Sequence, residues 1–427
     1  MKSTDAPSRT ASKIAFHTLI ISAASLFFDY MAYAMMVPLT PVSPANIHCT
    51  ADESIIVFAY SVGLLVAAVN IKRLCRRLSH RSQMVAATST LVCALSLIGS
   101  ATHLSIYILG RLLQGAAAAM TSIVGFAAVA RAFPTQRVRM LGVVLAAGSA
   151  GFIIGPVFGG LLFGLGGYRL PFLCFGLPLA ILGLAQWHFL RSDGDPPAQI
   201  TQLGLLDVGV IDGAKHGCLS TARGSRRMAT AAAQSLPLMR SISVPALLAA
   251  LCAASWATLE ALVPLTLYQE YAQSPQAVGA VFSFNSLLAM LTNFLIIIFA
   301  TKVTSSQLAV LGLALSCAIF VTLALIAHIY VLWLAVPLAG IAYSVLVNAS
   351  TALFADRVDR TSTEGDVYQH AYAIFSIAYG IGYCIGSGVE FLCASFATFH
   401  SINLTLSCVF ASLLPFVVTY RVRARSQ

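Results

Sequence analysis

The segment GSAGFIIGPVFGG, residues 148–160, lies in the middle of a long apolar stretch and decides the architecture that we expect. Five glycines recur in it at intervals near four residues: Gly148, Gly151, Gly155, Gly159 and Gly160. This spacing places most of them on one face of a helix. In an apolar helix such a face lets a neighbouring helix approach closely, and Pro156 predicts a kink. The segment therefore predicts a tightly packed helix inside a membrane.

The composition of the whole chain indicates the same environment. Of its 427 residues, 58% are hydrophobic and only 9% are charged, and the mean hydropathy is +0.85. A soluble domain contains about 25% charged residues. Twelve apolar segments approach the length of about 20 residues that a membrane-spanning helix needs: 14–40, 53–71, 83–103, 105–130, 138–164, 170–190, 244–268, 277–300, 306–327, 329–354, 367–394 and 399–420. We expect an all-α membrane protein with twelve transmembrane helices in two six-helix bundles.

One long polar stretch divides these segments into six and six. The expected parts are a tail (1–13), an N-terminal six-helix bundle (14–190), a linker (191–243), a C-terminal six-helix bundle (244–420) and a second tail (421–427). The tetrapeptide VPLT occurs at Val37–Thr40 and again at Val263–Thr266, which are equivalent places in the two halves. Internal repeats of this kind are typical of secondary transporters.

The net charge of +10 follows the expected topology. If both termini and the linker are cytoplasmic, all but two of the 25 Lys and Arg residues fall in cytoplasmic segments or tails. The exceptions are Arg111, which lies within a span, and Arg169. The positive-inside rule explains this distribution, so the basic surplus needs no nucleic-acid partner. We expect a multi-pass protein of the plasma membrane with both termini cytoplasmic.

Ionisable residues inside the spans are the candidate functional groups. An Asp or Arg at the centre of a span costs about 2.5–3.5 kcal/mol on insertion scales, so such residues are usually retained for function. We expect Asp29 and Arg111 to take part in proton coupling, with Asp29 as the partner of Arg111 in the same half. Alternatively, Asp29 only neutralises Arg111 or caps the backbone near Pro38. Glu260 has no basic residue in its own spans, so we expect its charge to meet a substrate.

Aromatic and polar residues of the spans are the candidate substrate contacts. A flat or cationic ligand is attracted to aromatic faces. The residues that we expect to join Glu260 in substrate binding are Tyr33, Tyr60, Trp256, Tyr343 and Asn348, with Tyr268 and Phe284 as further aromatic candidates. Each of these aromatic residues is also compatible with ordinary packing. Glu390 lies near the outer end of its span, where we expect it to be solvated.

Several of these motifs carry a resemblance to a known family. GRLLQG (110–115) and GSAGFIIGPVFGG resemble the span 4 and span 5 signatures of the major facilitator superfamily, the second being the antiporter motif of its drug:proton antiporters. FFDYMAYAMMVP (27–38), LEALVPLTL (259–267) and GDVYQHAYAIFSIAYGIGYCIG (365–386) resemble spans 1, 7 and 11 of the vesicular monoamine and acetylcholine transporters and their bacterial and fungal relatives. The resemblance implies the major facilitator fold and proton-coupled efflux of a hydrophobic or cationic small molecule by alternating access.

The chain also departs from that family. The loop KRLCRRLS has Lys72, Arg76 and Ser79 where the family pattern has Gly, Asp and Gly. Tyr60 stands where the vesicular transporters carry a Lys in span 2, and neither span 10 nor span 11 keeps their Asp. A facilitator without proton coupling and a non-transporting sensor of the same fold therefore remain alternatives.

An enzyme is not expected, because no cluster of His, Asp, Glu or Cys offers a nucleophile with its base or a metal site. The cysteines have no metal-binding spacing, so we expect neither a metal nor a cofactor. The expected partners are a small-molecule substrate, protons and the lipid bilayer, and we expect a monomer.

Overall fold

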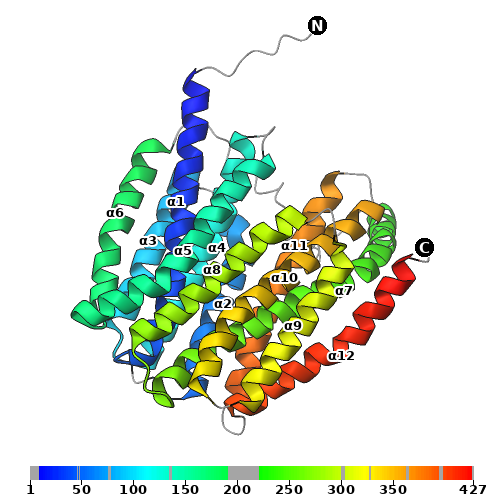
Figure 1. Cartoon of the computed structure of the whole chain (residues 1–427). Helices are drawn as coiled ribbons and strands as arrows, with labels where there is room; N and C mark the ends of the chain where they lie inside the picture. The colour runs from blue at the N-terminus through cyan, green and yellow to red at the C-terminus, as the bar shows by residue number, and fades with distance from the viewer. Residues whose placement is uncertain are drawn as a thin grey trace.

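The structure is a computed structural model that describes residues 9–45, 47, 49–75, 78–133, 137–190, 221–299, 303–326, 328–361, 365–393 and 398–425. These residues form twelve α-helices and one 3-10 helix, η1 (Figure 1). Their order is α1 (Arg9–Leu39), η1 (Thr40–Val42), α2 (Thr50–Cys75), α3 (His80–Ser100), α4 (Leu104–Ala132), α5 (Arg137–Gly166), α6 (Leu170–Phe189), α7 (Thr221–Gln269), α8 (Pro275–Phe299), α9 (Ser305–Leu325), α10 (Ile329–Thr361), α11 (Gly365–Cys393) and α12 (Phe399–Arg425).

The twelve helices correspond in order to the twelve expected spans. Among the described residues, eleven helices are long and apolar enough to cross a membrane, and α11 contributes the shorter apolar stretch Ile377–Cys393. Helices suit this environment because each satisfies its own backbone hydrogen bonds. The linker expected at 191–243 is helical from Thr221, where α7 begins, and residues 191–220 lie outside the described residues. The ends of the expected tails, 1–8 and 426–427, lie outside them as well.

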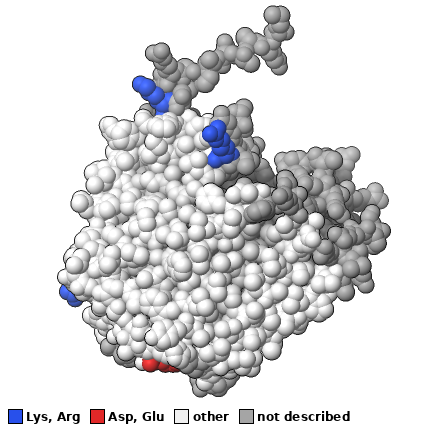
Figure 2. Space-filling model, viewed as in Figure 1, with Lys and Arg blue, Asp and Glu red and all other residues white. Residues whose placement is uncertain are grey.

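The bundle has two ends, which we call proximal (where α1 begins) and distal (where α1 ends). Successive spans run in opposite directions, so α2 and α8 begin at the distal end and α7 and α11 end there. On the face in Figure 2, charged side chains are almost absent from the flank, and most of the described basic ones lie near the proximal end. Lys13, Arg131 and Arg139 are exposed there, whereas exposed Arg169 precedes α6 at the distal end. This distribution matches the asymmetry expected from the sequence.

Each half has its own apolar core. Large, fully buried side chains such as Tyr107 and Phe175 belong to the core of α1–α6. Phe320 and Phe410 belong to the core of α7–α12. The halves meet chiefly where α5 packs on α8 and α2 packs on α11. Apolar side chains that face away from both cores, such as Leu173, are highly exposed and occupy the surface that lipid would cover.

The glycines of 148–160 explain why α5 lies so close to α1. Those that turn toward α1 are Gly148, Gly151, Gly155 and Gly159. A Cβ added at Gly155 would lie 2.6 Å from the carbonyl oxygen of Met31, and one at Gly159 would lie 2.8 Å from that of Met35. These distances leave no room for any side chain, so the backbones of α1 and α5 are in direct contact. Because α1 and α5 belong to the same half, this face holds that half together.

The opposite side of the motif contacts the other half. A Cβ at Gly160 would lie 2.8 Å from the carbonyl oxygen of Pro275, at the distal start of α8. One turn further along α8, Gly279 lies directly against the carbonyl oxygen of Pro156. The motif therefore has two faces, one that builds the N-terminal half and one that docks it on the C-terminal half. Any sliding between halves takes place at the second face.

We predict that Gly155→Ala lowers the melting temperature of the purified protein, because its methyl group would collide with the backbone of α1. Overpacking of this kind costs about 1–3 kcal/mol. Gly142→Ala is the matched control on the same helix, since a Cβ there meets nothing within 4 Å. It should leave the melting temperature equal or higher, because Ala favours a helix over Gly by about 0.5–1 kcal/mol. Equal melting temperatures for both variants would contradict the contact.

Candidate functional site

The candidate site lies at the junction of the two halves, where a carboxyl group of α7 meets hydroxyl groups of α1 and α11. Tyr33 of α1 donates a hydrogen bond of 2.5 Å to Oε2 of Glu260. Tyr383 of α11 donates to the same oxygen, and its hydroxyl oxygen lies against that of Tyr33. Trp256, one turn before Glu260 on α7, is a further hydrogen-bond partner of the carboxyl. Glu260 is 5% exposed, so this network ties the two halves together in a buried place.

Glycines of α11 bring Tyr383 to this position. Gly382 and Gly386 face α7 so closely that a Cβ at either would overlap the backbone at Ala250 and Ala254, respectively. The close approach of the two helices carries the neighbouring Tyr383 within reach of Glu260. The sequence analysis did not identify Tyr383 as a site residue. The signal available was its place in GIGYCIG (380–386), among glycines that repeat every two to four residues.

Arg111 of α4 is buried beside this network. Its Nη1 donates a hydrogen bond of 2.8 Å to Oε1 of Gln114, one turn along the same helix. Its guanidinium carbon lies 5.2 Å from the ring centroids of both Tyr33 and Tyr60, within the range of a cation–π interaction. Glu260 lies close enough to act electrostatically on the guanidinium. The cation is thus held by two aromatic rings, one amide and a carboxyl group of the other half.

The surroundings of these charges differ from expectation. Glu260 has no basic residue in its own spans, but Arg111 of the other half lies near enough to act on it electrostatically. Asp29 was expected to pair with Arg111, but neither of its carboxyl oxygens has a hydrogen-bond partner in the described part of the chain. Tyr33 lies one turn distal to Asp29 on α1. The guanidinium of Arg111 lies over the ring of Tyr33 and is therefore more distal than Asp29.

Asp29 is nonetheless deeply buried, with an exposed fraction of 1%. Burying an ionised carboxylate without a partner is very costly, so a buried group of this kind favours its neutral form. The structure therefore provides a carboxyl group suited to holding a proton, and a second carboxyl group, Glu260, that accepts hydrogen bonds from Tyr33 and Tyr383 and lies near Arg111. These two acids lie in different halves and in different environments.

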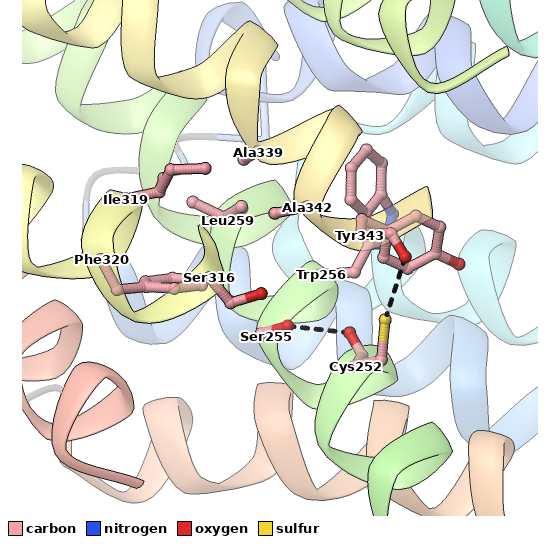
Figure 3. Close-up of a pocket in the computed structure, with 10 residues that line it drawn as sticks. All are labelled: Cys252, Ser255, Trp256, Leu259, Ser316, Ile319, Phe320, Ala339, Ala342 and Tyr343. Carbon is pink, nitrogen blue, oxygen red and sulfur yellow. Dashed lines mark hydrogen bonds between the residues drawn. The ribbon is translucent and has the colours of Figure 1, made fainter. Parts of the chain in front are cut away.

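The C-terminal half adds an aromatic cluster next to Glu260. The rings of Trp256 and Tyr343 lie 5.0 Å apart, and Tyr343 is hydrogen-bonded to Tyr379 of α11. Figure 3 shows both rings at one end of a pocket between α7, α9 and α10, where Cys252 donates to the carbonyl oxygen of Tyr343. The volume of this pocket is about 10 Å³, which is enough for roughly one water molecule. A drug-sized ligand does not fit there in this conformation.

A larger hollow of about 570 Å³ lies between α2 and α4. Its lining is almost wholly apolar and consists of Gly63, Val66, Ala67, Asn70, Leu112, Leu113 and Ala116. None of the expected substrate contacts lines it. Its volume lies in the range of small-molecule sites, but it lacks the convergent polar groups that usually orient a ligand.

The expected substrate contacts therefore fall into two groups. Tyr33 and Tyr60 pack together with ring centroids 4.5 Å apart and converge with Trp256 and Tyr343 around the junction. Three other candidates lie elsewhere. Asn348 donates to Asn293 of α8 at 2.7 Å and to a carbonyl of its own helix, and Tyr268 and Phe284 are 38% and 51% exposed.

Two further carboxyl groups differ from expectation. Glu390 was expected to be solvated, but it is 2% exposed and accepts a hydrogen bond from Ser54 of α2. The close packing of α2 on α11 removes it from solvent. Glu53, also 2% exposed, was not identified, because it stands in the first turn of its span, where an acidic residue is usually solvated. Four carboxyl groups and one guanidinium are therefore buried among the described residues.

Comparisons with known proteins agree with this architecture. The family model described as Major Facilitator Superfamily matches residues 22–387 and 245–427. Among curated proteins, the chain is 27% identical over 179 residues to "Multidrug resistance protein 2" of Bacillus subtilis (strain 168), covering 41% of this chain and 44% of that protein. It is 25% identical over 166 residues to "Probable vesicular acetylcholine transporter-B" of Danio rerio, covering 36% and 34%. The aligned part spans less than half the length of either relative.

Two solved structures share the fold over nearly the whole chain. One is a bacterial homolog of the human lysosomal transporter Spinster in an inward-facing, unoccupied conformation, with a TM-score of 0.65 and 14% identity over 96% of this chain and 94% of that one. The other is a mutant of the nucleoside transporter NupG, with a TM-score of 0.66 and 13% identity over 95% and 98%. At these identities the likeness concerns the fold alone.

We predict energetic coupling between Arg111 and Glu260 across the junction. Arg111→Gln and Glu260→Gln should each lower the free energy of unfolding, because each leaves a buried charge with fewer partners. The double variant should lose less than the two single losses together, with a coupling of about 0.5–3 kcal/mol. Denaturant titration in detergent measures this. Arg111→Gln combined with Glu270→Gln, which removes an exposed acid, is the control and should be additive. Additivity of the Arg111 and Glu260 variants would exclude a direct interaction.

Proposed function

The chain belongs to the major facilitator superfamily, and we propose that it exports hydrophobic or cationic small molecules across the membrane in exchange for protons. The observation that carries this proposal is the buried network at the junction, in which Glu260 of one half is bound by Tyr33 and Tyr383 and faced by Arg111. Such a network can form and break as the halves rock, so its occupancy would depend on conformation. The names of the curated relatives, which refer to multidrug resistance and to acetylcholine, support a small and often cationic substrate.

Asp29 is the group that we propose to carry the coupling proton. It is buried and has no hydrogen-bond partner among the residues that the structure describes, which favours the protonated form in this conformation. A conformation that admits water or brings a cation near Asp29 would favour release of the proton. Movement of one proton down about one pH unit and 100 mV yields roughly 3.7 kcal/mol. That free energy sustains a concentration ratio of several hundredfold for a neutral solute.

Glu260 and the surrounding rings are the groups that we propose to contact the substrate. A cation entering the junction would compete with Arg111 for the carboxyl group and would face Tyr33, Tyr60, Trp256 and Tyr343. Aromatic faces favour such ligands by about 0.5–2 kcal/mol each. Because the present pocket beside Trp256 is too small for a ligand, binding requires the junction to open.

We further propose that the proximal end is cytoplasmic. The positive-inside rule supports this orientation, because the basic residues of the sequence collect at that end. In a variant whose other nine cysteines are replaced by serine, the exposed Cys49 between η1 and α2 should react with a membrane-impermeant maleimide added to intact cells. A cysteine introduced as Lys13→Cys in a cysteine-free chain should react only after permeabilisation. The opposite pattern would reverse the orientation.

The transport proposal is tested in proteoliposomes with tetraphenylphosphonium as the cationic probe. Asp29→Asn should lose accumulation driven by a pH gradient while keeping exchange of the probe down its own gradient, because Asn is nearly isosteric and mimics a permanently neutral carboxyl group. Glu270→Gln, which changes an exposed acid, should retain both activities. Full gradient-driven transport by Asp29→Asn would refute the proton role. A parent protein that moves the probe but ignores the pH gradient would favour the facilitator.

A further inference from the structure

Glu390 is a buried carboxyl group that the proposed transport cycle does not use. It lies in the last turn of α11 at the distal end and is 2% exposed. Its Oε2 accepts a hydrogen bond of 3.3 Å from the hydroxyl of Ser54 on α2, across the junction of the halves. The hydroxyl of Thr258 on α7 also lies near the carboxyl group, although it donates to the carbonyl oxygen of Ala254. Among the described residues, Oε1 of Glu390 is buried with no hydrogen-bond partner. The carboxyl group therefore lies among hydroxyls in a place that water does not reach.

No cation compensates Glu390 among the described residues. The one charged group that acts on it is Glu53 of α2, which has the same sign. The groups that act on Glu53 are Asp52 of the same helix, Arg111 of α4 and Glu260 of α7. Arg111 thus lies within reach of Glu53 and Glu260 but does not act on Glu390. A buried carboxylate with an acidic neighbour is strongly disfavoured, so these surroundings favour the protonated form of Glu390.

The surroundings of Glu390 are contacts between the two halves at the distal end. On α11, Gly388 lies against the ring of Phe58, since a Cβ there would be 3.4 Å from it. On the proximal side, Tyr383 and its hydrogen bond to Glu260 separate Glu390 from the rest of the junction. Parting of α2 from α11 at the distal end would break the bond to Ser54 and expose Glu390 to the distal solution only.

From this placement we infer that Glu390 is a second proton-binding site, which links closure of the distal end to the pH of the solution on that side. The closed conformation holds the proton and the open one releases it. Low distal pH therefore favours closure, and the open fraction grows as that pH rises. Since the site meets only one solution, its proton regulates the cycle and is not transported. The inference rests on the alternating-access mechanism and the orientation proposed above.

A cysteine reporter at Val57 tests this site. Val57 is buried between α2 and α7 in the distal half of the junction, so it becomes reactive only when that end opens. In a chain with all native cysteines replaced by serine, Val57→Cys is labelled on intact cells with an impermeant maleimide at several external pH values. Maleimide reacts with the thiolate, whose fraction itself rises with pH, so each rate is divided by that of the exposed Cys49 kept as the single cysteine of a matched chain. This ratio should rise with external pH by at most about tenfold per unit, because one proton is released on opening. In Glu390→Gln the ratio should stay low at every pH.

Two matched variants complete the experiment. Glu270→Gln removes an exposed acid at the same end and should keep the pH profile of the parent. Ser54→Ala keeps the carboxyl group but removes its cross-half donor, and should raise the rate about two- to tenfold at low pH. A pH profile in Glu390→Gln equal to that of the parent would overturn the regulatory site alone. Absence of labelling in every variant at every pH would overturn both this site and the proposed opening of the distal end.

Discussion

One guanidinium and four carboxyl groups are buried in the described part of this chain, and this imbalance constrains the rest of the structure. Arg111 can compensate only one negative charge fully, whereas Asp29, Glu53, Glu260 and Glu390 are all at most 5% exposed. Burying an unpaired ion in a low-dielectric interior costs more free energy than any single packing contact contributes to stability. The folded chain must therefore carry protons on some of these acids, and which acids carry them depends on how the halves are arranged.

The arrangement of the halves decides which acid faces Arg111. Glu53 belongs to the same half as Arg111, whereas Glu260 comes from the other half and is joined to the N-terminal half through Tyr33. Rocking of the halves would move Glu260 relative to the guanidinium but would leave Glu53 in place. In the transport cycle that we propose, the cation would keep a carboxyl neighbour throughout, although the identity of that neighbour would change. The glycine contacts would let the N-terminal half move as one unit, because they pack the backbone of α5 directly on that of α1.

The sequence predicted the parts of this structure that depend on local pattern. The twelve spans, the division into halves and the glycine face of α5 follow from hydropathy and spacing, and Asp29, Arg111 and Glu260 stand out because charges are rare in spans. The sequence did not predict the features that depend on how the two halves pack against each other. The partner of Arg111 comes from the opposite half, and the burial of Glu390 depends on α2 covering the end of α11. Hydropathy also cannot distinguish Tyr268, which faces outward, from Tyr33, which faces the junction.

The central claim is that the folded protein holds protonated carboxyl groups at neutral pH because it has too few buried cations. Infrared spectroscopy of the reconstituted protein measures this directly, through the C=O stretch of the protonated carboxylic acid, which is separate from the bands of the carboxylate. Our account predicts this stretch at neutral pH, with a component lost in Asp29→Asn and another lost in Glu390→Gln. A spectrum without the stretch at neutral pH, or one that neither substitution changes, would contradict it.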